Sequence, residues 1–185
     1  MAVLAHSDSA RRLGRLALGL LVVLLRPSSA FAFEEHEVKA AFIFNFAKFI
    51  AWPKPAAFAA RERFVFCLVG DDAVGDALSE LVRHKTLHGV PVEVRRGRTP
   101  GEVRDCDVLY LSGGDGERLE TVIQQAQASP VLTVSDASGF ARWGGMIELY
   151  LEGRRVRFAV NVTAVRAAGL EPSSKLLALA RIVDH

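Results

Sequence analysis

Several residue patterns in this chain have the types and spacing for chemistry, but each lacks a partner that the chemistry needs. His84 and His88 stand four residues apart, a spacing that can present two imidazoles to one metal ion. Gly89 and Pro91 break this segment, however, and no third ligand of the right type lies nearby. The pattern therefore favours solvated loop histidines. No Gly-x-Ser-x-Gly motif is present either, and no histidine follows the serines in the order of a hydrolase triad.

Two glycine-containing turns follow predicted strands, and neither has the composition of a phosphate-binding loop. In GDDAVG, at residues 70–75, the second glycine is followed by Asp76 and Ala77, where a P-loop needs lysine and then serine or threonine. SGGDG, at residues 112–116, lacks the Gly-x-Gly-x-x-Gly spacing of dinucleotide-binding proteins. We interpret it as a plain turn in which Asp115 caps the next helix.

Asp71 and Asp72 stand at the end of the first predicted strand, as the acid pair of a phospho-receiver domain does. Such a domain also needs an aspartate at the end of the third strand, where this chain has Ser112. The sequence thus offers no nucleophile with a base, no metal-ligand set and no phosphate cradle. We predict a non-enzyme with no catalytic residues, no metal site and no cofactor.

The first 32 residues have the three-part layout of a secretory leader. Arg11, Arg12 and Arg15 form a basic start, an uncharged apolar run follows at residues 16–25, and Ala30-Phe31-Ala32 offers small residues where a signal peptidase reads them. An apolar helix of this length covers about 15 Å, half of a hydrocarbon core, so we expect a cleaved signal peptide and not an anchor. The alternative is a buried N-terminal core helix, but such a helix would explain neither the arginines nor the small residues of the cleavage site.

Export would place the mature chain, residues 33–185, outside the cytoplasm and would remove the charges of the leader. We predict that this mature chain is one periplasmic domain. The predicted leader holds four of the 23 basic and one of the 21 acidic side chains, so the mature chain has 19 against 20 and a net charge of −1. This balance gives no basis for nucleic-acid or membrane-surface binding. The periplasm also lacks a pool of ATP or NAD, which disfavours nucleotide-dependent chemistry.

The chain has two cysteines, Cys67 and Cys106. In an oxidising compartment an isolated pair favours a disulfide over two free thiols, and the absence of Cys-x-x-Cys disfavours a redox or zinc site. If the first and third strands end level, the two residues lie about 10 Å apart along the strands, beyond the limit of about 7 Å between Cα atoms. The bond therefore requires a staggered third strand or a loop at Cys106 that doubles back.

The order of the expected helices and strands predicts an α/β fold with a mostly parallel sheet. We expect a first helix at residues 34–52, unusually apolar around its circumference and stopped by Pro53 and Pro55. Strands follow at 63–69, 90–94, 107–111 and 131–134, with helices at 73–83 and 117–127. Right-handed crossovers give these four strands the order 2-1-3-4, with helices on both faces of the sheet.

A β-hairpin and two helical segments complete the chain. Residues 146–151 and 154–161 alternate in polarity, with one shared apolar face and one charged face. A hairpin with one polar face belongs at a sheet edge. We expect the last helices at residues 162–168 and 174–183, the second capped by Ser173 or Ser174.

Four blocks of sequence, taken together, resemble one family. They are EHEVKAAFIFNFAKFIAWP at 35–53, FCLVGDD at 66–72 with CDVL at 106–109, PVLTVSD at 130–136, and FA and GGMI within 140–147, running on to VRFAVNVTAVRAAGLEPSSKLLALARIV at 156–183. In this order and with short gaps, the set is similar to the YfiR family of periplasmic proteins over nearly the whole mature chain.

The resemblance implies a compact α/β domain, often dimeric, in which Cys67 and Cys106 form the family's disulfide. A second cysteine pair found in some members has no counterpart here, since residues 139–153 contain no cysteine. The resemblance also implies a function, because the best-understood members repress an inner-membrane diguanylate cyclase by binding its periplasmic domain. An OmpA-like outer-membrane lipoprotein can sequester the repressor, and cyclic di-GMP synthesis and biofilm growth then rise.

Two classes of function follow. A regulatory interaction protein would bind through aromatic and arginine side chains, the types that dominate contact hot spots. As partner-binding residues we select Phe44, Arg95, Arg96, Arg98, Phe140 and Trp143, the three arginines on a predicted loop, while burial in the core is the alternative for the aromatics. A periplasmic small-molecule sensor would instead bind its ligand at the strand ends near Asp71 and Ser112.

We expect protein purified from the periplasm to begin at or near Phe33, because the leader ends in a small-x-small site directly before that residue. Intact-mass spectrometry measures the mature N-terminus. An uncleaved chain in the cytoplasmic fraction would contradict export.

Overall fold

The computed structural model of the protein describes residues 34–53, 62–70, 73–102, 105–113, 116–126 and 130–183. The predicted signal peptide and Asp71, Asp72 and Asp115 lie outside these described residues. The described ranges all fall within the unit Phe33–His185. None of the helices in them combines the length and the hydropathy that a membrane span requires.

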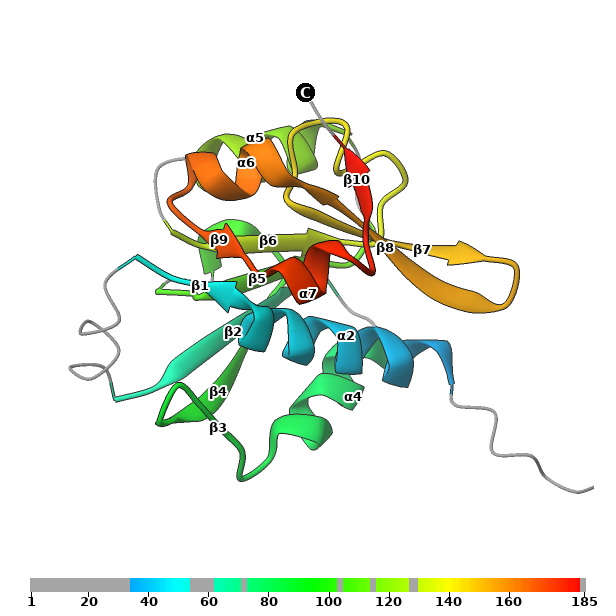
Figure 1. The fold of residues 1–185 in the computed structure, drawn as a ribbon. Helices are drawn as coiled ribbons and strands as arrows, with labels where there is room; N and C mark the ends of the chain where they lie inside the picture. Colours follow the sequence, from blue (N-terminus) through cyan, green and yellow to red (C-terminus); the bar gives the residue numbers. More distant parts are fainter. Residues whose placement is uncertain are drawn as a thin grey trace, which may run out of the picture. The chain divides into compact units, whose positions relative to one another are not determined.

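A mixed sheet organises the fold, with strands in the order β10-β8-β7-β6-β5-β2-β4-β3 (Figure 1). β4, β2, β5 and β6 are parallel neighbours, which confirms the predicted order 2-1-3-4. β3 is short and covers only Val90 and Pro91 of β4. The strands are β2 (Phe64–Val69), β3 (Thr86–Leu87), β4 (Val90–Gly97), β5 (Val108–Leu111), β6 (Leu132–Ser135), β7 (Ile147–Glu152), β8 (Arg155–Asn161) and β10 (Arg181–Val183).

Helices cover both faces of the parallel strands, as predicted. All six residues of β2 are buried, and they alternate between two apolar clusters. Phe64, Phe66 and Leu68 pack with α2 (Glu35–Phe49) and α4 (Ala73–Val82). The alternate residues, Val65, Cys67 and Val69, pack with α5 (Gly116–Ala126) on the other face. The continuous apolar run of this strand is the composition that burial on two faces requires.

The hairpin of β7 and β8 pairs as predicted, but it does not lie at the sheet edge. Leu149 lies opposite Phe158, and Leu151 lies opposite Val156. At its base β7 pairs with β6 and β8 pairs with β10, so the base of the hairpin is internal to the sheet and the tip extends beyond these neighbours. The edge prediction was wrong because the chain returns and adds a strand, in which Ile182 lies opposite Val160.

The predicted helix at residues 174–183 is shorter than its apolar pattern indicated. α7 covers Ser174–Leu177, and the Ser173 side chain caps it by accepting the Leu176 N–H. The residues beyond it form β10, where ladder hydrogen bonds replace those of a helix. The first helix, α2, ends at Phe49, because the next two residues form β1 (Ile50–Ala51). This strand pairs with β9 (Glu171–Pro172), which follows α6 (Val162–Ala167).

A disulfide joins Cys67 and Cys106, whose Cα atoms lie 5.7 Å apart. Cys67 lies opposite Leu109 in the ladder, so Cys106 approaches it through a loop and not through strand pairing. Asp105 has a φ of 55°, and this left-handed residue lets the loop double back, the second of the two arrangements that the bond allows. The Asp107 carboxylate accepts the Val65 N–H at 2.8 Å and holds the loop against β2.

We expect Cys106→Ala to lower the free energy of unfolding by about 2–5 kcal/mol, because the bond closes a long loop in the unfolded chain. Cys106 is the better site for this change, since replacing the fully buried Cys67 would add a cavity. Urea unfolding measures the effect, and the reduced wild type is the control. Equal stability of oxidised and reduced wild type would contradict a structural role for the bond.

Candidate functional site

A polar network ties α2 to the carboxyl ends of the central strands. Asp136, directly after β6, accepts the Gly113 N–H at 2.8 Å and the Lys39 ammonium at 2.9 Å. A hydrogen bond from Tyr110 also reaches this carboxylate. Lys39 pairs in addition with Glu35, one helical turn away, at 2.7 Å.

The network stabilises the charged forms of its two central members. Burial alone would raise the pKa of Asp136, but the hydrogen bonds from Gly113 and Lys39 hold that pKa below its ordinary value. Burial alone would likewise lower the pKa of Lys39, yet its hydrogen bonds to Glu35 and Asp136 raise it. Both groups are therefore charged at neutral pH, and they connect α2 to the sheet as an ion pair.

The sequence predicts a small-ligand site at the carboxyl ends of β2 and β5, which are neighbouring strands of the sheet. The winding direction changes between β2 and β5, which is where ligands of doubly wound sheets bind. Gly70 follows β2 with a φ of 116°, and a Cβ there would lie 2.9 Å from the Ser112 Cβ. This contact is that of two adjacent strand ends, and a ligand site above them stays a prediction.

Two further buried polar side chains fix the loop between β6 and β7. The Glu148 carboxylate accepts the N–H groups of Gly139 and Ala141, each at 3.2 Å. The Asn161 amide donates to the Ala141 carbonyl at 2.9 Å and accepts the Ala164 N–H at 2.9 Å. These side chains serve the backbone, and no buried side-chain N or O atom of the described ranges is without a hydrogen-bond partner.

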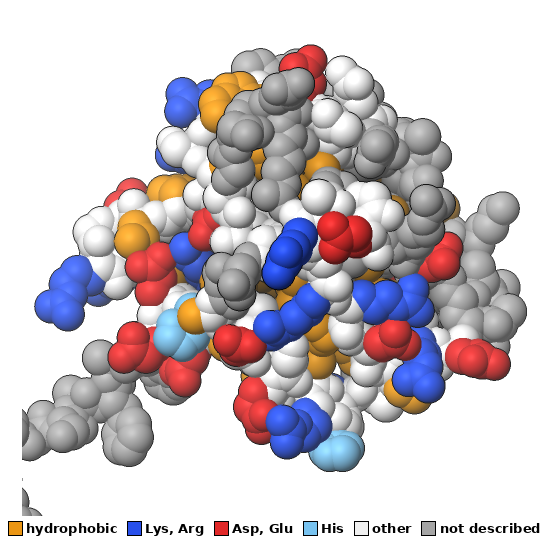
Figure 2. Space-filling model, turned by 180° about the vertical axis from the view of Figure 1, so that it is seen from behind, with side chains coloured by type: hydrophobic (Ala, Val, Ile, Leu, Met, Phe, Trp, Pro, Cys, Tyr) orange, Lys and Arg blue, Asp and Glu red, His pale blue; other side chains and the backbone are white. Residues whose placement is uncertain are grey.

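The three arginines selected from the sequence do not form a patch on a loop. β4 continues to Gly97, so Arg95 and Arg96 are strand residues and face opposite sides of the sheet. Arg95 pairs with Glu93 at 2.7 Å, Arg96 pairs with Asp76 of α4 at 2.9 Å, and Arg98 follows the strand. The loop prediction was wrong because the strand extends three residues past its expected end. On the face shown in Figure 2, positive and negative side chains are interleaved.

Among the selected aromatic residues, Trp143 alone is exposed, with 56% of its surface accessible. The Phe44 ring is buried against Phe66, at a centroid distance of 6.3 Å. Phe140 is fully buried in the cluster beneath α5, where its ring contacts Gly145. Phe44 and Phe140 are therefore core residues in this fold, and we do not retain them as partner anchors.

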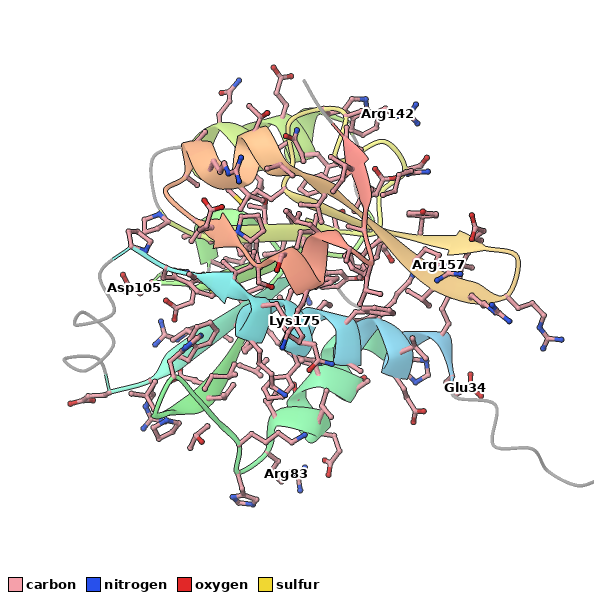
Figure 3. The ribbon with its side chains drawn as sticks, in the orientation of Figure 1. Glu34, Arg83, Asp105, Arg142, Arg157 and Lys175 are labelled. Carbon is pink, nitrogen blue, oxygen red and sulfur yellow. A yellow bond between two sulfur atoms is a disulfide. The ribbon has the colours of Figure 1, made fainter. Side chains whose placement is uncertain are left out.

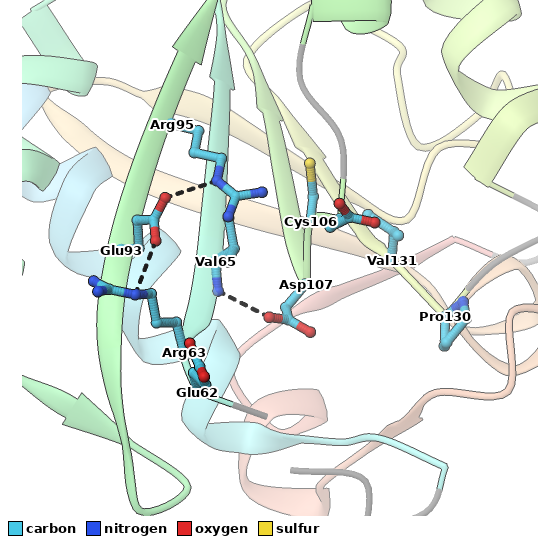
Figure 4. A pocket seen from close by; sticks show the side chains of 10 residues that line it. Glu62, Arg63, Val65, Glu93, Arg95, Cys106, Asp107, Pro130 and Val131 are labelled. Carbon is cyan, nitrogen blue, oxygen red and sulfur yellow. Dashed lines mark hydrogen bonds and ion pairs between the residues drawn. The ribbon is translucent and has the colours of Figure 1, made fainter. Parts of the chain in front are cut away.

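The amino-terminal ends of the parallel strands border a pocket of about 590 Å³ beside the disulfide (Figure 4). Arg63 and Arg95 both pair with Glu93, at 3.4 and 2.7 Å. Arg95 holds the pKa of Glu93 below its ordinary value through their hydrogen bond. The guanidinium groups are thus engaged inside the pocket, whose other charged lining residues, Glu62, Asp105 and Asp107, are acidic.

Two grooves of about 680 Å³ each flank α2, and sequence reasoning missed both. One lies between α2 and α4 and has an acidic rim of Glu37, Asp76 and Glu80. The other, which we call the hairpin groove, lies between α2 and the tip of the β7–β8 hairpin. Its lining residues are Glu35, Val38, Phe42, Leu151, Gly153, Arg154, Arg155, Val156 and Arg157. Alternation in the hairpin sequence indicated a charged face, but nothing local indicated that its tip meets the first helix.

His84 and His88 are exposed loop residues, and both have a left-handed backbone, with φ of 61° and 50°. A ring nitrogen of His88 lies 3.0 Å from the Ala47 carbonyl, and its ring packs against Trp52. Across the described ranges, no three His, Cys, Asp or Glu side chains are grouped to hold a metal ion.

Comparisons with known proteins bear on nearly the whole described chain. A family model described as YfiR/HmsC-like matches residues 36–181. The chain is also similar to a solved structure, a conserved domain protein from Vibrio cholerae O1 biovar El Tor strain N16961, with 14% sequence identity and a TM-score of 0.48. This match covers 82% of the chain but 60% of the other protein, so the chain spans less than two thirds of that protein's length.

We expect Asp136→Asn to lower the free energy of unfolding at neutral pH by about 1–3 kcal/mol, because it leaves the half-buried Lys39 with a weaker partner. The folded-state pKa of Asp136 lies below its unfolded value. Its stabilisation is therefore complete above the unfolded pKa and is lost as the pH falls through the folded pKa.

The variant should consequently lose less stability than the wild type between about pH 5 and pH 2, as measured by urea unfolding. Glu35→Gln is the matched control, since Glu35 is the more exposed partner of Lys39, and it should change stability by less than about 1 kcal/mol. Equal effects of the two variants would contradict the central position of Asp136.

Proposed function

The chain belongs to the YfiR/HmsC-like family, and we propose that it is a non-enzymatic periplasmic regulator, which represses an inner-membrane diguanylate cyclase by binding the periplasmic domain of that cyclase. The observation that carries the proposal is the family match over residues 36–181, which includes almost every element from α2 to β10. Cyclic di-GMP synthesis, and through it biofilm growth, is then the process under control.

Repression by binding requires the protein to distinguish two states of the cyclase. A ligand shifts an equilibrium only by the difference between its affinities for the two states. A repressor that binds the inactive state about a hundredfold more tightly shifts the balance by about 2.7 kcal/mol. Such discrimination needs a surface of fixed shape, and the buried Glu148 and Asn161 support one by fixing the loop between β6 and β7.

The disulfide supports an oxidising compartment. Bonds of this kind persist in the periplasm and are rare in the cytosol of mesophiles. Cys67 is fully buried and Cys106 lies in the loop that the bond anchors, so the pair has a structural position in the fold. A cleaved signal peptide would deliver the chain to the same compartment.

The proposal includes two further partners. An OmpA-like outer-membrane lipoprotein would relieve repression by sequestering the regulator, and the regulator itself would be a homodimer. Trp143 remains a proposed contact residue, because a large aromatic side chain with 56% of its surface exposed is typical of binding hot spots. Arg95 and Arg96 are already paired with acidic neighbours in their own fold, so they have less free capacity for a partner.

The alternative function, a periplasmic sensor of small molecules, has less support from the described residues. Of its two predicted positions, Asp71 lies outside the described residues, and Ser112 lies against Gly70. The polar groups at these ends are also engaged, since Asp136 binds Gly113 and Lys39.

Deletion of the gene should raise cellular cyclic di-GMP severalfold in a host that carries a membrane cyclase, because the inactive state of the cyclase then loses its ligand. Mass spectrometry of nucleotide extracts measures the level. Removing the cyclase gene as well should abolish the rise, which identifies the enzyme that is repressed.

Two complementation arms control this experiment. The complete gene should restore the low level, whereas a version that starts at residue 33 without the leader should fail because it stays in the cytoplasm. An unchanged cyclic di-GMP level in the deletion strain would contradict the proposed function.

A further inference from the structure

The hairpin groove joins an apolar floor to a strongly basic wall. Val38 and Phe42 of α2 form one side of the floor, and Leu151 and Val156 of the hairpin form the other. Arg154, Arg155 and Arg157 stand around the hairpin tip, and one acidic residue, Glu35, lines the groove with them. The groove is thus positively charged on a fold whose mature chain is close to neutral.

Two of these arginines have no ion-pair partner among the described residues. Arg157 pairs with Glu152 at 3.3 Å, but Arg154 and Arg155 form no such pair. Most other arginines of the described fold are paired, including Arg63, Arg96 and Arg166. The unpaired guanidinium groups at the hairpin tip therefore keep their capacity for bidentate hydrogen bonds to carboxylates.

Exposed apolar surface lies next to this free positive charge. Half of the Leu151 side chain remains accessible in the folded chain, at 50%. An apolar surface with arginines beside it has the composition of a protein contact site, because the core of an interface is apolar and Arg is enriched in binding hot spots.

The walls of the groove are held in place before any partner arrives. The Phe42 ring packs on Phe158 of the hairpin with their centroids 5.5 Å apart, and on Phe46 at 5.9 Å. The cross-strand pair of Leu151 and Val156 fixes the hairpin register at its tip. A preformed groove loses less conformational entropy on binding than a mobile one does.

We propose that the hairpin groove binds an acidic amphipathic helix of a protein partner, with the apolar stripe of that helix on the floor and its carboxylates on Arg154 and Arg155. This inference rests on the proposed function and names the surface through which it acts. A helix suits the site because the groove runs between a helix and a hairpin, and helices dock in such grooves through one apolar face. An anionic lipid surface is the alternative occupant, and vesicle binding in the test below distinguishes it from a helix.

The test compares hairpin-tip variants with matched changes elsewhere. Arg154→Glu/Arg155→Glu and Leu151→Ser alter the groove. Arg83→Glu/Arg166→Glu reverses two exposed arginines outside it, and Leu179→Ser removes an even more exposed leucine. Figure 3 shows Arg83 and Arg157 at different ends of the fold. All the substituted side chains are exposed, and thermal melts identical to the wild type establish that each variant folds.

In the deletion strain, both hairpin variants should fail to lower cyclic di-GMP, and both control variants should repress like the wild type. Purified mature protein should bind the periplasmic domain of the repressed cyclase, and the hairpin variants should bind it at least about tenfold more weakly. If the deletion raises cyclic di-GMP but the hairpin variants repress normally, the groove proposal is overturned while the proposed function stands.

If the deletion has no effect on cyclic di-GMP, the proposed function fails and the groove is judged by binding alone. The probe is then a synthetic helix of about 18 residues, or five turns, with leucine on one face and glutamate on the other. Fluorescence anisotropy should show that this peptide binds the wild type and binds Arg154→Glu/Arg155→Glu more weakly. A peptide with lysine in place of each glutamate should not bind the wild type.

Three results of these measurements would overturn the proposal. The first is equal binding of the acidic and the basic peptide. The second is binding to phosphatidylglycerol vesicles that Arg154→Glu/Arg155→Glu alone abolishes, which would assign the groove to lipid. The third is a dimer in sedimentation that the same variant alone dissociates, which would assign the groove to a second copy of the chain.

Discussion

The burial of the parallel strands on both faces is the constraint on which the rest of this structure depends. A strand such as β2, whose residues are all buried, must be covered on two sides, and α4 and α5 do this as part of crossover connections. α2 is different, because it precedes the first parallel strand and is not part of a crossover. Its apolar face is buried in the core, and the Lys39–Asp136 ion pair and the short pairing of β1 with β9 attach it further. Residues of α2 also line two grooves.

Buried polar groups in this fold hold segments that lack regular structure. Asp107 binds the backbone of β2 beside the disulfide, Glu148 binds the loop before β7, and Asn161 joins that loop to α6. The bond to Asp107 has the short length typical of charge-assisted hydrogen bonds, at 2.8 Å, whereas those to Glu148 measure 3.2 Å. The irregular segments are thus fixed by buried side chains that bind the backbone.

The sequence was sufficient for features that depend on local pattern and on general rules of chain connection. The order of β4, β2, β5 and β6 follows from the handedness of crossovers, and the pairing of Leu149 with Phe158 follows from alternation. It was insufficient where distant segments meet. Lys39 and Asp136 are 97 residues apart, and neither residue carries a local sign of the other.

The same limit explains the errors at strand ends. Residues 181–183 form a strand only because β8 offers an open side to them, and their own apolar pattern was equally consistent with a helix. The end of β4 was set too early, which moved Arg95 and Arg96 from a sheet to a loop. The candidate surface changed accordingly, from those arginines to Arg154 and Arg155 at the hairpin tip.

The short reach of β3 has a consequence for the solubility of the protein. Because β3 covers only Val90 and Pro91, the outer edge of β4 beyond them has no neighbouring strand in the described part of the sheet. An open edge is a template on which another chain can add a strand and start aggregation, and charged side chains and proline are the residues that oppose this. Glu93, Arg95 and Arg96 lie along that edge. Charged side chains at such positions are the type that opposes edge-to-edge assembly, a role that needs no partner at all.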